Sequence, residues 1–175
     1  MAKRINPVVL FVLLPAFLAP LGCGRSKAPE APTTRQKAPN FELTDLAGKK
    51  VRLSDYQGKV VLLDFWATYC DPCHDSIPMF ERFYEENRTQ GLEVVGVSLD
   101  VDTSVVPDFV KKNGVQYAIV LDPTQSTPAS FGVRGMPTTL LVDRAGNVRR
   151  RWLGFDPQIG GEIRSEFERA LREKA

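Results

Sequence analysis

Histidine is almost missing from this sequence of 175 residues, because His74 is the only one. A copper-delivery protein that relies on a second, distant histidine is therefore excluded. Together with Cys70 and Cys73, His74 also falls one ligand short of a structural zinc site. A strong charge of one sign is lacking as well, since 23 Lys and Arg stand against 21 Asp and Glu. The composition therefore gives no sign of nucleic-acid binding.

A hydrophobic run long enough to cross a membrane is also missing. The longest uncharged stretch, Val8–Leu21, is interrupted by Pro15 and Pro20, and its roughly 14 residues fall short of the about 20 that a spanning helix needs. Two basic residues precede it, which is typical of a secretory signal peptide. We therefore expect residues 1–22 to be a signal peptide of the lipoprotein type.

Cysteine is scarce too, with three residues in the chain. Cys23 directly follows the apolar run and resembles a lipoprotein processing site, so we expect it to carry lipid; an ordinary cleaved signal with a spare thiol is the alternative. Residues 23–37, rich in Pro, Ala and Thr, should then form a flexible tether. Lipidation would leave Cys70 and Cys73 as one pair, which in an oxidising compartment needs a dedicated electron source or sink.

Strand and helix patterns alternate along residues 38–175. The apolar run Lys59–Trp66 predicts a strand buried on both faces. From Cys70 to about Asn87 the apolar period predicts a helix that Pro78 should kink. The other expected elements are a hairpin within Phe41–Leu53, strands at Leu92–Leu99, Tyr117–Leu121, Thr138–Val142 and Val148–Leu153, and helices at about Val106–Asn113 and Pro157–Glu173. Such alternation implies one α/β domain with a partly parallel sheet.

The stretch WATYCDPCHD at 66–75 admits two chemistries. The spacing CxxCH attaches a c-type haem, whereas CxxC alone is a redox dithiol. A haem would need a second axial ligand besides His74, such as Met79 or Met136. Cytochromes with this motif are helical around the haem, while here the motif follows a buried strand, so the context favours the dithiol.

The position of Cys70 suits disulfide exchange. A strand that ends before it and a helix that begins at it place its sulfur at a helix N-terminus, where free amide hydrogens and the helix dipole favour an anion. A thiolate is the nucleophile in disulfide exchange. We therefore expect Cys70 to attack a partner's disulfide and Cys73, one turn further and less exposed, to resolve the mixed disulfide.

These motifs together carry a family resemblance. WATYCDPC, Pro78 and GVRGMPTTLLVDRAGNV at 132–148 resemble thioredoxin, while APNFELTDLAGKKVRLSDYQGK at 38–59 and the insert between Leu99 and Gly132 resemble the membrane-anchored TlpA/ResA-like branch. The resemblance implies a thioredoxin fold: a central mixed β-sheet flanked by helices, with an N-terminal β-hairpin and a central insert. It also implies an extracytoplasmic thiol:disulfide oxidoreductase that reduces exported proteins, apocytochrome c among them, with electrons from a membrane reductant.

The resemblance assigns two further site features. Met136-Pro137 matches a cis-proline loop that pairs with the substrate backbone; an ordinary turn is the alternative. Asp64 matches a buried acid that would move the Cys73 proton; a structural acid at the strand end is the alternative. Many TlpA/ResA-like proteins instead have asparagine here and a glutamate at the position of Ser76. This departure puts apocytochrome specificity in doubt and favours Asp64 as the acid/base.

Residues near the dithiol should modify its reactivity. Asp71, Pro72 and His74 are the expected redox-tuning residues, because a negative Asp71 opposes a Cys70 thiolate and a protonated His74 favours it. Trp66 and Tyr69 are the expected surface flanking Cys70, unless they belong to the core or its rim. The run Arg149–Arg151 is either a basic patch or a solvated strand edge, and the latter interpretation is preferred.

The sequence therefore predicts a lipid-anchored, monomeric thiol:disulfide oxidoreductase on the periplasmic side of a bacterial membrane. It should reduce oxidised exported proteins and be recharged by a membrane thiol reductant, with no prosthetic group and no metal. The alternatives are an oxidase that donates the Cys70–Cys73 disulfide, a peroxiredoxin-like peroxidase and the cytochrome. A peroxidatic cysteine normally follows Pro-x-x-x-Thr-x-x-Cys, and this chain has Leu63 and Ala67 in place of the proline and threonine.

Overall fold

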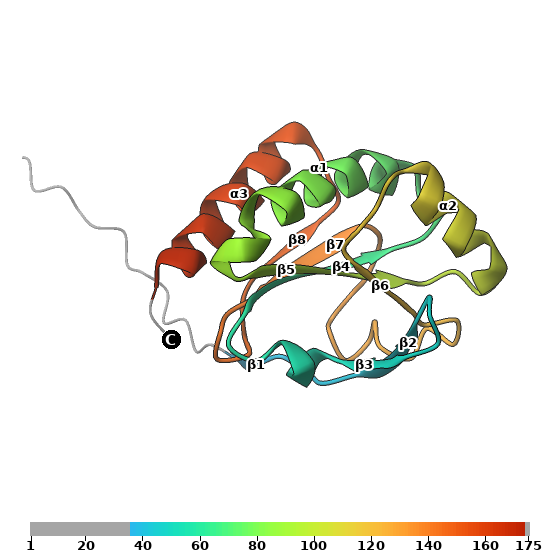
Figure 1. Ribbon diagram of the computed structural model, residues 1–175, viewed down its shortest axis with the longest axis horizontal. Coiled ribbons are helices and arrows are strands. Elements are labelled where there is room, and N and C mark those ends of the chain that lie inside the picture. The colour runs from blue at the N-terminus through green and yellow to red at the C-terminus, as the bar shows by residue number, and fades with distance from the viewer. Residues whose placement is uncertain (1–35, 174–175) are drawn as a thin grey trace, which may run out of the picture. The chain divides into compact units, whose positions relative to one another are not determined.

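The computed structural model describes residues 36–173. The expected signal peptide, the lipidation site at Cys23 and all but the end of the tether lie outside these residues. Eight strands form one mixed sheet in the order β1-β8-β7-β4-β5-β6-β2-β3 (Figure 1). They are β1 (Gln36–Lys37), β2 (Glu42–Asp45), β3 (Lys50–Arg52), β4 (Val60–Trp66), β5 (Leu92–Ser98), β6 (Ala118–Leu121), β7 (Thr138–Val142) and β8 (Asn147–Leu153).

The central strand β4 is buried along its whole length. It pairs in parallel with β5 and antiparallel with β7, and β5 pairs in parallel with β6. All seven residues of β4 are buried, which explains why its sequence is a nearly continuous apolar run and not an alternating one. Asp64 is the exception to that apolar run.

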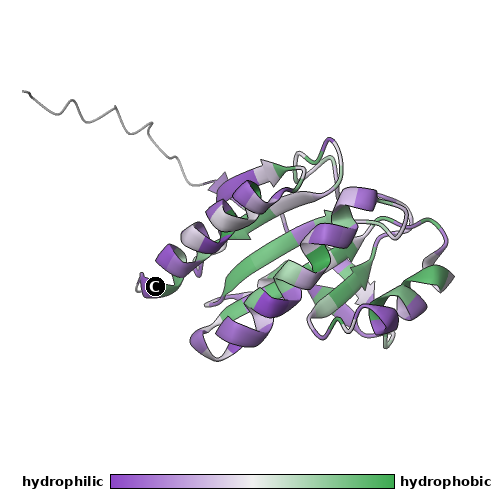
Figure 2. Ribbon diagram, turned by 90° about the horizontal axis from the view of Figure 1, so that it is seen from above, coloured by the Kyte–Doolittle hydropathy of each residue, from purple (hydrophilic) through white to green (hydrophobic). Residues whose placement is uncertain are grey.

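Helices cover one face of the sheet. Figure 1 shows α1 (Asp71–Asn87) and α3 (Pro157–Arg172) side by side over it, with α2 (Val106–Lys112) beyond the end of α1. Their inward residues join one core cluster with the inner residues of β4, β5 and β7, and Figure 2 shows the hydrophobic residues concentrated on the strands and hydrophilic residues along the helices. Helix α3 buries Gly160, Ile163, Phe167 and Ala170.

The opposite face of the sheet is covered by the N-terminal hairpin of β2 and β3, a 3₁₀ turn at Leu53–Tyr56 and the loop that contains Phe131. The Phe131 ring lies 5.4 Å from that of Phe65 on β4 and 6.2 Å from that of Phe41. Aromatic rings at such spacing add specific attraction to burial. The hairpin and the loop that contains Phe131 therefore form a second core layer.

Most expected elements are present, with small shifts. Leu53 begins the 3₁₀ turn where a strand was expected, and Gln36–Lys37 at the end of the expected tether pairs with β8. Two residues that pair only through their backbones leave no hydrophobic pattern in the sequence. Pro78 lies inside the continuous helix α1, where its ring costs one backbone hydrogen bond.

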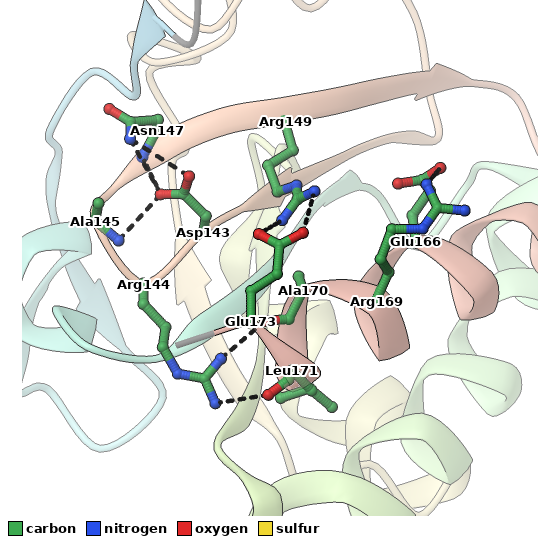
Figure 3. Close-up of polar contacts among 10 residues, drawn as sticks. All are labelled: Asp143, Arg144, Ala145, Asn147, Arg149, Glu166, Arg169, Ala170, Leu171 and Glu173. Carbon is green, nitrogen blue, oxygen red and sulfur yellow. Dashed lines mark hydrogen bonds and ion pairs between the residues drawn. The ribbon is translucent and has the colours of Figure 1, made fainter. Parts of the chain in front are cut away.

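The turn between β7 and β8 also fixes the end of α3. Arg144 donates to the carbonyl oxygens of Ala170 (3.0 Å) and Leu171 (3.3 Å), as Figure 3 shows. The last carbonyls of a helix lack partners within the helix and are stabilised by a cation. This contact therefore anchors α3 against the sheet.

Candidate functional site

The two cysteines lie at the start of α1. Cys70 is the N-cap residue of the helix, and a disulfide joins it to Cys73, with the Cα atoms 5.3 Å apart. The N–H of Cys73 donates to the Cys70 carbonyl oxygen (2.9 Å), so the first turn of the helix sets the spacing of the two sulfurs. The pair is therefore built at the positive end of the helix dipole.

The two cysteines differ in exposure. Cys70 is 7% exposed, whereas Cys73 is completely buried in the core cluster beneath α1. A large partner can reach only a sulfur at the surface. The geometry thus allows attack at Cys70 before any reaction at Cys73.

A buried carboxylate that the sequence analysis missed fixes the segment that leads to Cys70. Asp100 accepts hydrogen bonds from the Thr68 N–H (3.0 Å), the Thr68 hydroxyl (2.6 Å) and the Ser98 hydroxyl (2.9 Å). It is only 3% exposed. Asp100 lies just after the end of the buried strand β5, and this position was the sequence signal that could have identified it. It holds the loop between β4 and α1 in register with β5.

His74 is tied to the same loop. Its Nε2 lies 2.8 Å from the Thr68 carbonyl oxygen, and its ring centroid lies 5.2 Å from that of Phe109 on α2. A carbonyl oxygen only accepts, so Nε2 carries the proton in this contact. Asp71 and Pro72, the other expected tuning residues, are exposed on the first turn of α1.

Asp64 is completely buried on β4. It lies on the same face of the sheet as Leu62 and Trp66, which belong to the core cluster that contains both cysteines. Its Oδ1 accepts a hydrogen bond from the Thr139 hydroxyl (2.9 Å), while no described residue donates to Oδ2. Burial raises the pKa of Asp64 to about 7, and the Thr139 bond opposes that rise. A carboxyl in this position can carry a proton near neutral pH.

Two more polar side chains, those of Tyr117 and Glu81, are buried. Tyr117 is buried, and its pKa is raised well above the usual value, first by burial and then by the charges of Asp64 and Glu81. Glu81 accepts a hydrogen bond from the Gln116 N–H (2.7 Å). Sequence reasoning gave no reason to select these residues, because both occur within ordinary amphipathic patterns.

The Met136–Pro137 peptide bond is cis. Thr138, the next residue, pairs with Phe65 near the end of β4, so the loop lies beside the segment that leads to Cys70. Within the described part of the chain, no hydrogen bond reaches the backbone N–H or C=O of Met136. This backbone edge is therefore unpaired within residues 36–173.

One residue expected at the surface beside Cys70 lies in the core instead. Trp66 is completely buried, packing its ring 5.2 Å from Phe109, so the prediction that it forms the surface beside Cys70 was wrong. Alternation along β4 turns its side chain into the core beneath α1. Tyr69 is 64% exposed next to Cys70, and Met136 is partly buried. Of the expected surface residues, Tyr69 and Met136 thus remain accessible.

Known proteins are similar to this chain in sequence and in fold. The AhpC/TSA family matches residues 34–151. The thiol-disulfide oxidoreductase ResA of Geobacillus thermodenitrificans is 34% identical over 146 residues, which is 83% of this chain and 84% of that protein.

Solved structures agree with this relationship. A crystal structure assigned to a thiol:disulfide interchange protein, DsbE, of Chlorobium tepidum superposes with a TM-score of 0.75 at 38% identity, over 78% of this chain and 96% of that one. A secreted thiol-disulfide isomerase of Corynebacterium glutamicum gives 0.70 at 25% identity, over 78% and 86%. The predicted thioredoxin-like fold is confirmed. The chain belongs to the AhpC/TSA family and is a ResA-like thiol-disulfide oxidoreductase.

Proposed function

We propose that this oxidoreductase reduces disulfides of exported proteins through a Cys70–Cys73 dithiol. The observation that carries the proposal is the disulfide at the N-terminus of α1, in which Cys70 keeps some exposure and Cys73 has none. A nucleophile must be reachable, while a resolving thiol needs only to reach its neighbour.

The exchange proceeds in two steps. The Cys70 thiolate attacks one sulfur of the client disulfide, which forms a mixed disulfide and releases the other client sulfur as a thiolate. Cys73 then gives up its proton and attacks Cys70, which releases the second client thiolate and leaves the Cys70–Cys73 disulfide. Two electrons pass to the client, so the cycle requires no prosthetic group or metal.

Asp64 is the proposed acceptor of the Cys73 proton. Its pKa of about 7 and its place in the layer that holds Cys73 suit a base that works near neutral pH. Tyr69 and the open backbone of Met136 beside Pro137 would contact the client, and Asp71, Pro72 and His74 would adjust the potential of the dithiol.

The proposed location is extracytoplasmic, with the protein held to a bacterial membrane by lipid on Cys23. The signal-like segment before Cys23 and the secreted relative from Corynebacterium glutamicum support it. None of the helices described between Gln36 and Glu173 is long and apolar enough to cross a membrane. In this location a monomer would need a membrane thiol reductant to restore its dithiol.

The reduction potential tests the direction of electron flow. Equilibration of the purified protein with glutathione buffers should give a value near the roughly −270 mV of thioredoxin, which suits a reductase. A value near about −120 mV would instead identify a disulfide-donating oxidase of the same fold.

A trapping experiment tests the order of the sulfurs and identifies the clients. Cys73→Ser should accumulate mixed disulfides between Cys70 and exported proteins, whereas Cys70→Ser should accumulate none. Mass spectrometry of the conjugates then shows whether apocytochrome c is a client. Equal trapping by both variants would contradict the assigned roles.

A further inference from the structure

A cavity of about 300 Å³ lies behind the cis-proline loop. Its walls come from the loop after Phe131 and from the adjoining ends of β7 and β8, and they consist of Gly132, Arg134, Thr138, Arg151 and Leu153. The lining combines an apolar side chain, Leu153, which is 61% exposed, with two guanidinium groups. Nothing in the proposed exchange cycle uses these residues.

Neither arginine of the cavity has a carboxylate partner among residues 36–173. Among the described residues no Asp or Glu oxygen lies within 4.0 Å of Arg134 or Arg151, and the recorded contact of Arg151 is a hydrogen bond to the Phe131 carbonyl oxygen (2.7 Å). That bond holds the guanidinium over the cavity edge, where a Cβ on Gly132 would come within 3.2 Å of it. Two guanidinium groups that line one cavity, with no carboxylate against them in the described part of the chain, can bind an anion.

The neighbours of Arg151 on β8 show the contrast. Arg149 forms a two-point ion pair with Glu173 at the end of α3 (2.5 and 2.9 Å), as Figure 3 shows. Arg150 pairs with Glu162 (2.8 Å) and lies over the Trp152 ring. The basic run is thus divided: two arginines brace α3, and Arg151 is left to the cavity on the other side of β8.

Strand pairing connects the cavity to the redox site. Leu153 pairs with Thr138, and the Gly154 N–H donates to the Pro137 carbonyl oxygen (2.8 Å). The cavity therefore begins directly behind the cis-proline loop. A client backbone that pairs with the open edge of Met136 would place residues beside its cysteine near Leu153 and Arg134.

We propose that this cavity is a client-recognition site that binds an acidic side chain, Asp or Glu, located a few residues from the client cysteine. Arg134 and Arg151 would bind the carboxylate, and Leu153 would pack against its methylene stem. The inference rests on the proposed exchange function, because it concerns which disulfides reach Cys70.

Short peptides test the proposal directly. Each has one cysteine as a neutral 2-pyridyl disulfide, an amidated C-terminus and a single Glu or Gln, scanned from one to four positions on either side. Attack by the reduced protein on the peptide sulfur releases pyridine-2-thione, whose absorbance gives the second-order rate constant of this single-turnover step. At one or two positions the Glu peptide should react roughly fivefold faster than its Gln twin at low salt, and the advantage should shrink at high salt.

Variants assign the preference to the cavity. The double change Arg134→Gln with Arg151→Gln should abolish it, and Arg134→Glu, at an exposed position that can change without loss of the fold, should turn it toward a Lys peptide. Arg150→Gln is the matched control on the same strand and should keep the preference for Glu. No advantage for Glu at any position, or a preference that survives both cavity variants, would overturn the proposal.

Two further measurements separate the possible failures. Neutral 2,2′-dithiodipyridine, which has no peptide, measures the intrinsic reactivity of Cys70 in the wild type and in each variant, and the peptide rates are normalised to it; no reaction even with the wild type would contradict the exchange function itself. A Gln peptide with a free C-terminus distinguishes the source of the carboxylate. Acceleration of that peptide without acceleration by internal Glu would contradict an acidic side chain as the occupant.

Discussion

Asp64 is a buried carboxyl whose ionisation opposes folding. A carboxyl without a cationic partner among the described residues lies in a fully buried strand, and a single hydroxyl bond from Thr139 compensates for only part of the lost hydration. The protonated form is therefore favoured by folding. The raised pKa that would make Asp64 a useful base also means that the folded protein loses stability when Asp64 ionises.

Asp64→Asn should change the pH dependence of stability. The pKa of Asp64 in the folded state, about 7, lies above its ordinary value of 3.8. The contribution of protonated Asp64 to the stability of the folded state is therefore complete below pH 4, and it is lost as the pH rises through about 7. The wild type should lose on the order of 2–4 kcal/mol of unfolding free energy across this range relative to Asp64→Asn. Urea denaturation of both oxidised proteins from pH 4 to 8 measures the difference, and parallel profiles would contradict it.

The position of the Cys70 sulfur depends on how strand β4, the loop after it and helix α1 are joined. The short loop between β4 and α1 must leave a buried strand and start a helix within a few residues, and the N–H and hydroxyl of Thr68 hold it there by donating to Asp100. Asp100 thus links this loop to the end of β5, beside the backbone bond from the Leu99 N–H to the Trp66 carbonyl oxygen (2.8 Å). A loop fixed in this way needs little reorganisation when a client arrives.

Asp100→Ala should loosen the loop. The N–H and hydroxyl of Thr68 and the hydroxyl of Ser98 would lose their acceptor, which costs about 2–3 kcal/mol for such buried groups. We expect a lower denaturation midpoint and slower reaction of the reduced protein with a small disulfide. Asp102→Ala is the control, since the bonds of Asp102 to Ser104 stay within an exposed turn. Equal effects of the two variants would show that Asp100 has no special role.

At the scale of the whole molecule, the sheet separates two cores with different tasks. The core beneath the helices contains the disulfide and Asp64, while the other joins the hairpin, the loop that contains Phe131 and the sheet. Phe131 belongs to the second core and contacts both Phe41 of the hairpin and Phe65 of β4. The loop from Phe131 also leads into the cavity and the cis-proline, so packing on this face positions the client-binding side.

Phe131→Ala should destabilise the whole domain. Removal of a fully buried phenylalanine typically costs about 3–5 kcal/mol, and because its ring bridges the hairpin and the sheet, near-UV and far-UV circular dichroism should lose their signals in one transition. Leu46→Ala, in the exposed hairpin turn, should change stability by less than about 0.5 kcal/mol. Separate transitions for the two probes would show that the hairpin unfolds independently.

Much of the architecture could be predicted because its signals are local. The uniform apolar composition of β4, the change of period at Cys70 and the amphipathic pattern of α3 each lie within one segment. The predictions failed where the outcome depends on contacts between distant segments. Trp66 ends a buried strand, but whether its ring is covered or faces a client depends on α2, whose Phe109 packs against it, and the pairing of β1 with β8 has no apolar pattern at all.

The sequence by itself determined the dithiol, its place at a helix start and the fold class, since hydrophobic periodicity and a short motif encode them directly. Tertiary structure alone decided how strongly Asp64 is desolvated, that Asp100 ties the loop to β5, and which of three consecutive arginines lacks an acidic partner among the described residues. Burial and pairing arise from residues far apart in the chain, so their energies exist only once the sheet and helices have come together.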